Sequence, residues 1–497
     1  MTYQLQKTND AQAQAHDQQH DQQHETRTPR LRQFTRFDLS VVVAISLLVG
    51  AILVTIVLGD RVGVTLVRVS PLGEAHSTSR IVVEFSEQMD RESVAERFRL
   101  APEVPGAISW SNRTLSYRPD AALTPGTDYT VILEAGAVSV GGREVLSEYQ
   151  FGFTVLLPRV AYLYPSDSAP SNLWIADPTD PHSAEQLTFS TGGIYDFAVN
   201  PDGTQIAYAQ NRTDSQSTDL YLLDLETGTV QQLTNCIDSQ CTTPVWRPDG
   251  RTIAYERIDF NTGVGGVGPS PPRIWLLDLT SVPATTRPLF AESQILGYNA
   301  QWSADGSRIA LFDSASSAIL VYDFPTDQIL AVSSRAGSSG ALSPDGTRLV
   351  YPDITLLDDL PPWPHLRVVD LESEEQTNLS EPGGVIEDGR ALWRPDGEML
   401  AVARRYHDAT GTRGYQIVLV DPSEGGETQT VTSDPRYANN FFWWDPTGTQ
   451  LVIQRFPELD ENMQPNRLGR PEIWTVDVTT GEGTQVAVNG FLPRWVP

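Results

Sequence analysis

The stretch WRPDGEMLAV at residues 393–402 contains the pattern that decides the fold. A tryptophan precedes the turn Arg394-Pro-Asp-Gly397, and the short apolar strand Leu400-Ala-Val402 follows it. Proline suits the second position of a type I turn, and glycine tolerates the left-handed conformation after it. Such a turn predicts two adjacent antiparallel strands. The turn recurs at 200–203, 247–250, 303–306, 343–346 and 445–448.

Each repeat also contains a later strand that ends in aspartate, such as Ile417-Val-Leu-Val-Asp421. Seven of these strands follow residue 158, spaced 45 to 56 residues apart, and they end at Asp177, Asp224, Asp278, Asp323, Asp370, Asp421 and Asp477. A period of this length with short strands is typical of propeller blades. We therefore predict an all-β fold with a seven-bladed β-propeller at 158–497. Six or eight blades are the alternatives.

The ends of the repeated region predict how the ring closes. The first blade starts at Arg159-Val-Ala-Tyr162 without a tryptophan-bearing strand, and the chain ends with such a strand, Phe491-Leu-Pro-Arg-Trp495. Closure of the first blade by the last strand would remove exposed sheet edges. The repeat resembles the TolB-type propeller repeat. Relatives of that type include periplasmic scaffolds and non-catalytic lids of prolyl-oligopeptidase-type enzymes, so the resemblance implies a fold rather than one function.

Residues 62–156 show a different strand pattern. Alternating apolar residues at 80–85, 114–118, 128–133 and 149–155 predict the short strands of a β-sandwich. The phrases Val83-Glu-Phe-Ser-Glu-Gln-Met-Asp90 and Leu123-Thr-Pro-Gly-Thr-Asp-Tyr129 resemble the SbsA-type bacterial Ig-like domain. That resemblance implies a spacer or adhesive unit without catalysis.

An uncharged run from Leu39 to Leu58 is long enough to cross a membrane as a helix. A cleaved signal peptide would have a shorter run and a small-residue cleavage site. The N-terminal flank of this uncharged run carries four arginines, Arg27, Arg30, Arg32 and Arg36. By the positive-inside rule, the N-terminus is then cytoplasmic. We predict a disordered cytoplasmic tail at 1–38, a single transmembrane helix at 39–59, and an extracytoplasmic location for the bulk of the chain.

The charge and the cysteine content exclude some classes of partner and site. The chain has 63 acidic and 35 basic residues, giving a formal charge of −28. An acidic surface repels phosphate backbones, which argues against a nucleic-acid partner. The two cysteines, Cys236 and Cys241, have no neighbouring His or Cys to complete a metal site. A disulfide that closes the loop between them is expected outside the cell.

Loops of variable length predict a binding face. The Pro-Asp-Gly turns and the links after each aspartate strand vary little in length, whereas the connections on the opposite face vary greatly. Variable loops on a rigid scaffold are the usual place for recognition. The candidate binding residues are Trp363, Tyr406, His407, Arg436 and Tyr437. The alternative is that these aromatic residues are scattered on the surface without a common role.

The sequence lacks catalytic signatures such as a G-x-S-x-G elbow, an H-E-x-x-H motif or a P-loop. We therefore expect no catalytic residues, no metal ligands and no cofactor. The prediction is a membrane-anchored, non-enzymatic binding or scaffold protein of a bacterial cell envelope, with an envelope protein or cell-surface glycan as its partner. The alternative is a carbohydrate- or peptide-processing hydrolase that uses loop carboxylates, for which Asp358-Asp359, Glu458, Asp460 and the pair His407-Asp408 are the candidates.

Overall fold

The computed structural model describes residues 36–57, 63–167, 170–180, 182–260, 268–291, 295–356, 358, 361–423 and 426–497. Most of the tail predicted at 1–38 therefore lies outside the described residues. The chain divides into two compact units, Met1–Gly63 and Val64–Pro497.

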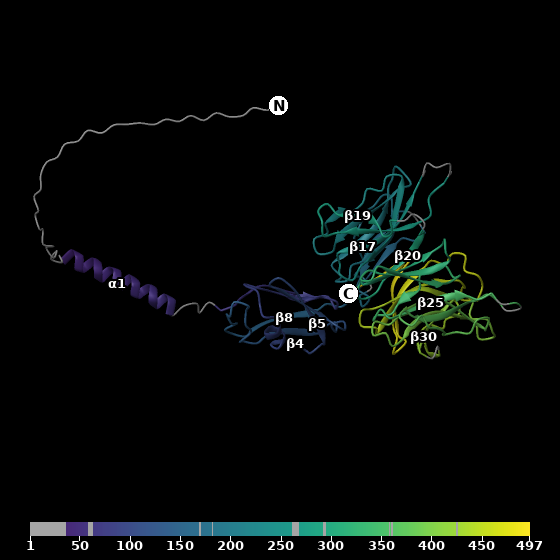
Figure 1. Cartoon of the computed structure of the whole chain (residues 1–497). Helices are drawn as coiled ribbons and strands as arrows, with labels where there is room; N and C mark the ends of the chain where they lie inside the picture. Colours follow the sequence, from purple (N-terminus) through teal and green to yellow (C-terminus); the bar gives the residue numbers. More distant parts are fainter. Residues whose placement is uncertain are drawn as a thin grey trace, which may run out of the picture. The chain divides into compact units, whose positions relative to one another are not determined.

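Helix α1 (Arg36–Val57) is the described element of the first unit (Figure 1). Its part Arg36–Val54 is long and apolar enough to cross a membrane, a test that a signal sequence also passes, and none of that span is buried. The helix starts three residues before the predicted position 39. Asp38 in its first turn suits the positive end of the helix dipole.

The predicted β-sandwich consists of two four-stranded sheets, in the orders β1-β3-β6-β5 and β2-β8-β7-β4. Its strands are β1 (Leu66–Ser70), β2 (Gly73–Ala75), β3 (Ile81–Phe85), β4 (Phe98–Ala101), β5 (Gly106–Ser111), β6 (Thr114–Pro119), β7 (Asp128–Leu133) and β8 (Tyr149–Val155). In β3, Ile81, Val83 and Phe85 are buried while the residues between them are partly exposed, as the alternation predicts. Asp90 caps the short helix α2 (Arg91–Ala95) by accepting from the Ser93 amide at 2.9 Å, so its role is structural.

The strands from β9 onward form the propeller. The sheet made by both ends of this region contains β9 (Arg159–Tyr164), β10 (Asn172–Ala176), β11 (Glu185–Gln186) and β36 (Phe491–Val496). An eight-stranded sheet contains two meanders, β12 (Ile194–Val199), β13 (Gln205–Asn211), β14 (Thr218–Asp224), β15 (Val230–Gln232) and then β16 (Ser239–Trp246), β17 (Thr252–Asp259), β18 (Arg273–Asp278), β19 (Thr285–Pro288). Each of these four-stranded meanders is called a blade below.

Four further sheets are single four-stranded blades. They are β20 (Gly297–Trp302), β21 (Arg308–Asp313), β22 (Ala318–Asp323), β23 (Gln328–Ser333); β24 (Ala341–Leu342), β25 (Arg348–Ile354), β26 (Pro364–Asp370), β27 (Gln376–Asn378); β28 (Ile386–Trp393), β29 (Leu400–Tyr406), β30 (Gln416–Val420), β31 (Glu427–Thr430); and β32 (Tyr437–Trp444), β33 (Gln450–Pro457), β34 (Glu472–Asp477), β35 (Gly483–Val488).

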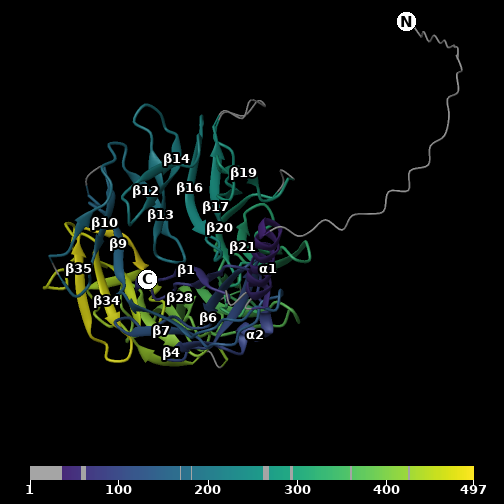
Figure 2. The ribbon, with the colours of Figure 1, turned by 90° about the vertical axis from the view of Figure 1, so that its left-hand side faces the viewer.

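The inner strands contact one another in the order β12, β16, β20, β24, β28, β32 and β36, and β36 returns to β12. Figure 2 shows the strands following one another around a ring, with β34 and β35 beside β9 and β10. The predicted closure is confirmed, because β36 pairs with β9 antiparallel and places Trp495 opposite Val160. This closure gives the edge of β9 a hydrogen-bonded neighbour.

Tryptophans at the ends of five inner strands join neighbouring blades. Each of five indole Nε1 groups donates to a backbone oxygen of the preceding inner strand at 3.0–3.3 Å: Trp246 to Ala198, Trp302 to Val245, Trp393 to Ala341, Trp444 to Leu392 and Trp495 to Trp443. A buried indole N–H needs an acceptor. The recurrence of tryptophan therefore follows from the stacking of blades.

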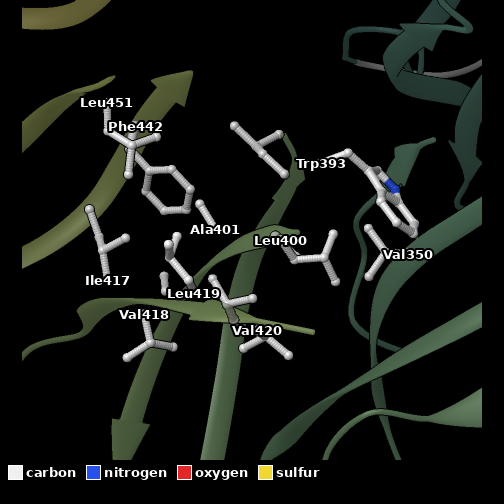
Figure 3. Close-up of a cluster of buried hydrophobic side chains, with 14 of the residues drawn as sticks. Val350, Trp393, Leu400, Ala401, Ile417, Val418, Leu419, Val420, Phe442 and Leu451 are labelled. Atoms are coloured by element: carbon white, nitrogen blue, oxygen red, sulfur yellow. The ribbon is translucent and has the colours of Figure 1, made fainter. Parts of the chain in front are cut away.

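Apolar side chains of neighbouring blades form the core between them. In Figure 3, Leu400 and Leu419 lie between Trp393 on one side and Phe442 on the other. Leu400 and Phe442 are fully buried. The short apolar strands that follow the turns thus fill the spaces between sheets, as expected for blades that cannot bury both faces alone.

Within the second unit, the Ig-like domain is hydrogen-bonded to the turn face of the propeller. Arg80 Nη2 donates to the Pro248 oxygen at 2.8 Å, and Arg118 Nη2 donates to the Ala304 oxygen at 3.2 Å. Both acceptors belong to turns of the repeated Pro-Asp-Gly type. These bonds occupy the turn face and involve none of the long loops at the other strand ends.

Candidate functional site

The long loops join the second and third strands of each blade, at the strand ends opposite the Pro-Asp-Gly turns. This follows from the antiparallel order of the strands in each blade. The loops that matter for the predicted site are 355–363, 407–415 and 458–471, together with the link 431–436 between β31 and β32.

One group of side chains surrounds Glu387 and is called the Glu387 cluster. It contains Glu387 of β28, Arg405 of β29, and the loop residues His407, Tyr415 and Trp363. His407 Nε2 lies 2.6 Å from one Glu387 carboxylate oxygen, and Arg405 Nε donates to that oxygen at 3.0 Å. The Tyr415 hydroxyl donates to the other oxygen. The Trp363 ring stacks on the His407 ring, with centroids 3.9 Å apart and planes 4° apart.

The electrostatics of Glu387 favour its ionised form. Burial alone would raise the pKa of Glu387, but the hydrogen bonds from Tyr415, Arg405 and His407 outweigh it and lower this pKa below its usual value. Burial, and then the bond to Glu387, raises the pKa of Tyr415. A carboxylate with a lowered pKa and donors on both oxygens is poorly suited to act as a general acid. It is well suited to hold Trp363 and His407 in place.

A second group lies on the neighbouring blade and is called the Arg455 cluster. The Arg455 guanidinium lies 3.9 Å from the Tyr437 ring centre and 3.8 Å from that of Trp474. Glu472 accepts from Arg455 Nε at 3.1 Å and from Trp474 Nε1 at 2.8 Å. A cavity of about 260 Å³ adjoins this cluster, and its lining includes Asp434, Tyr437, Asn439, Arg455 and Trp474.

Hydrogen bonds connect the two clusters. Gln416, which follows Tyr415, donates from Nε2 to the Tyr437 oxygen at 2.9 Å. Asn439 Nδ2 donates to Gln416 Oε1 at 3.0 Å. The two clusters therefore form one continuous rim across adjacent blades.

The five predicted residues are distributed over this rim rather than gathered at one point. Trp363 and His407 meet in the Glu387 cluster, and Tyr437 is in the Arg455 cluster. Arg436 Nη2 pairs with Asp434 at 2.6 Å, which lowers the pKa of Asp434. The Tyr406 hydroxyl donates instead to Glu427 on β31. Their role in binding stays a prediction.

Sequence reasoning missed the residues that organise the rim: Glu387, Arg405, Tyr415, Arg455 and Trp474. Three of them, Glu387, Arg405 and Arg455, are charged residues inside regular strands, whereas the predicted binding residues were loop residues. A charged residue within a predicted strand was the available signal, because such a residue needs a partner when it is partly buried.

Three of the loop carboxylates suggested for a hydrolase, Asp408, Glu458 and Asp460, have partners in the described part of the chain. Glu458 forms an ion pair with Arg413, with Oε2 and Nε 3.4 Å apart. Asp408 accepts from the amide and hydroxyl of Thr410, at 2.8 and 2.6 Å, and so shapes a turn. His407 bonds to Glu387, as described above. Asp460 accepts from the Asn462 and Gln464 amides. Asp359 lies outside the described residues. The residues described include no group of three or more His, Cys, Asp or Glu that could hold a metal ion.

Cys236 and Cys241 form a disulfide, with Cα atoms 6.3 Å apart. Cys241 belongs to the inner strand β16, and Cys236 to the link before it. The bond therefore fixes the entry of the chain into an inner strand, on the long-loop side of the ring.

Comparisons with known proteins agree with this architecture. Residues 60–155 match the family model of the bacterial Ig-like domain. Dipeptidyl-peptidase 5 of Porphyromonas gingivalis is 28% identical over 140 residues, which is 26% of this chain and 19% of that protein, so the match spans a small part of that relative's length.

Solved structures with a similar fold include TolB from Acinetobacter baumannii, with a TM-score of 0.40 at 14% identity, over 88% of this chain and 99% of that one. A prolyl endopeptidase has a TM-score of 0.46 at 11% identity, over 82% of this chain and 52% of its own. The chain thus combines a helix long and apolar enough to span a membrane, a bacterial Ig-like domain and a β-propeller.

Proposed function

We propose that this protein is a membrane-anchored, non-enzymatic binding protein whose propeller rim engages a partner outside the cytoplasm. The observation that carries the proposal is the continuous rim formed by the Glu387 and Arg455 clusters. Its tryptophan, tyrosine and arginine side chains are the types enriched in protein interfaces. Their hydrogen bonds hold them in fixed positions, which reduces the entropy lost on binding.

The rest of the chain supports binding at the propeller rim. In this proposal helix α1 is the anchor, and by the positive-inside rule the arginines before it favour a cytoplasmic N-terminus. The Ig-like domain follows as a spacer and bonds to the turn face through Arg80 and Arg118. The long-loop rim at the opposite strand ends then stays accessible to an envelope protein.

Site-specific photo-crosslinking in native membranes tests this proposal. A p-benzoylphenylalanine is introduced at Tyr406 or Tyr437 on the rim, and at exposed Glu226 in the short link between β14 and β15 as the matched control. We expect both rim positions to crosslink to the same envelope protein and Glu226 not to do so. Equal products at all three positions, or none at the rim, would contradict the proposal.

Two other results would change the partner or the activity that we propose. A rim adduct that carries sugar and no peptide would identify the cell-surface glycan of the sequence-based prediction as the partner. Sustained hydrolysis of peptides or glycans by the full chain, abolished by Glu387→Gln or Asp460→Asn, would replace the binding protein with the hydrolase alternative.

A further inference from the structure

Two arginines on inner strands of the ring lie against the same pair of aromatic rings. Arg390 of β28 and Arg494 of β36 place their guanidinium carbons 4.4 and 4.3 Å from the ring centre of Trp443 on β32. They lie 5.0 and 4.9 Å from the ring centre of Phe441. All three strands have a register irregularity close to these residues. Irregularities of this kind redirect side chains.

This cluster has donors without acceptors. Nε and Nη2 of Arg390 and Nε1 of Trp443 are covered from solvent and have no hydrogen-bond partner in the part of the chain described. Arg494 donates from Nη1 to the oxygen of Pro493 at 3.1 Å. Buried donors are nearly always paired in folded proteins. Trp443 differs from its neighbour Trp444, whose indole makes the bond between blades.

The two arginines also lie close enough for their charges to interact. Burial lowers the pKa of Arg390 to about 9, with a contribution from the charge of Arg494. Burial lowers the pKa of Arg494 to about 10, against the attraction of Asp196. Both groups are therefore cationic at neutral pH. Burial raises the pKa of Asp196 of β12, whose charge attracts Arg494, and it also raises the pKa of Glu256, which accepts from the Asn299 amide at 2.8 Å. Burial thus disfavours the negative charge of both acidic residues.

We propose that Arg390, Arg494 and Trp443 form a site for a carboxylate on the inner strands of the propeller. A planar carboxylate matches the paired donors of a guanidinium. Its negative charge would offset the repulsion between the two arginines. The unpaired indole and guanidinium donors would gain acceptors. This site is separate from the rim and does not depend on the function proposed for the rim.

Acetate binding to the full chain, purified in a neutral detergent, tests the site. Isothermal titration at constant ionic strength should show saturable acetate binding, and the melting temperature should rise more in acetate than in chloride. Arg390→Gln and Arg494→Gln should each weaken acetate binding at least about tenfold. Arg257→Gln is the matched control, because Arg257 also stacks on a tryptophan, at 4.6 Å from the Trp275 ring, but already pairs with Asp259 at 2.7 Å.

The stability of the variants separates a binding site from a structural contact. Without acetate, Arg390→Gln should melt at or above the temperature of the unmodified chain, because it removes repulsion between two buried cations. A lower melting temperature together with unchanged acetate binding would overturn the proposal. Equal effects of acetate and chloride on the unmodified chain, or tighter binding of inorganic phosphate, would also overturn it, and these measurements need no variant to fold.

Discussion

The Trp393→Phe substitution removes one hydrogen bond between neighbouring blades while it keeps an aromatic ring in place. The indole Nε1 of Trp393 donates to the Ala341 oxygen at 3.0 Å, and both residues are buried. Loss of the bond leaves that oxygen unpaired and costs about 1–3 kcal/mol. The smaller ring also leaves a gap near Val350 (Figure 3) and weakens stacking with Arg348, 4.6 Å from the Trp393 ring centre, which adds about 1 kcal/mol. We expect a total loss of about 2–4 kcal/mol.

Trp443→Phe is the matched control, because it makes the same change in ring size where the indole has no acceptor in the described chain. Its cost should be about 1 kcal/mol or less. Urea unfolding of the full chain, followed by circular dichroism, measures both variants. Hydrogen exchange of the amides in β24 and β28 then reports whether the loss is local. If Trp393→Phe destabilises the propeller no more than Trp443→Phe does, the indole bonds contribute nothing to blade association.

Three further changes test other parts of the structure. Phe442→Ala empties a fully buried position and should cost about 3–5 kcal/mol in urea unfolding, whereas Phe189→Ala, at a side chain that is 79% exposed, should change stability by less than about 0.5 kcal/mol; similar losses would contradict the burial pattern. Reduction of the Cys236–Cys241 bond should lower stability by about 2 kcal/mol because the closed loop is short, and a Cys236→Ser/Cys241→Ser chain should show no response to reductant. The lowered pKa of Glu387 means that its ionised form stabilises the fold above the unfolded pKa of about 4.3, and that this contribution disappears as pH falls through the lower folded value. The melting temperatures of Glu387→Gln and the unmodified chain should therefore converge on acidification below about pH 4.3, and a constant difference would refute this role.

The sequence predicts the strands well because their signals are local. The turn at Arg394-Pro-Asp-Gly397 and the alternation at 80–85 each specify structure within a few residues. The hydrogen bond of the Trp393 indole could not be predicted in the same way, since its acceptor at Ala341 lies 52 residues away on another blade. The recurrence of tryptophan indicated that the position mattered. It did not indicate that the N–H group, as well as the ring, has a partner.

In the candidate site too, local features could be predicted from the sequence, whereas contacts between blades could not. His407 and Asp408 are adjacent in sequence and suggested a catalytic pair, yet Asp408 closes a turn with Thr410 and His407 reaches Glu387, 20 residues earlier. Stacking of Trp363 on His407 joins loops of two different blades. Contacts between blades depend on the geometry of the ring, which no single repeat encodes. Exposed aromatic loop residues were therefore identified individually, while their grouping around Glu387 and Arg455 was not.

Hydrogen bonds on the turn face explain why loop length varies on only one side of the propeller. The aspartates that end the third strands accept from a following Ser or Thr, as Asp224 does from Thr227 at 2.8 Å. Neighbouring turns are also linked, since Arg247 Nε donates to the Gly306 oxygen at 2.9 Å. An insertion on this face would break bonds within and between blades. The loops at the opposite strand ends can lengthen without disturbing these links, so the stability of the ring confines variation in loop length to that face.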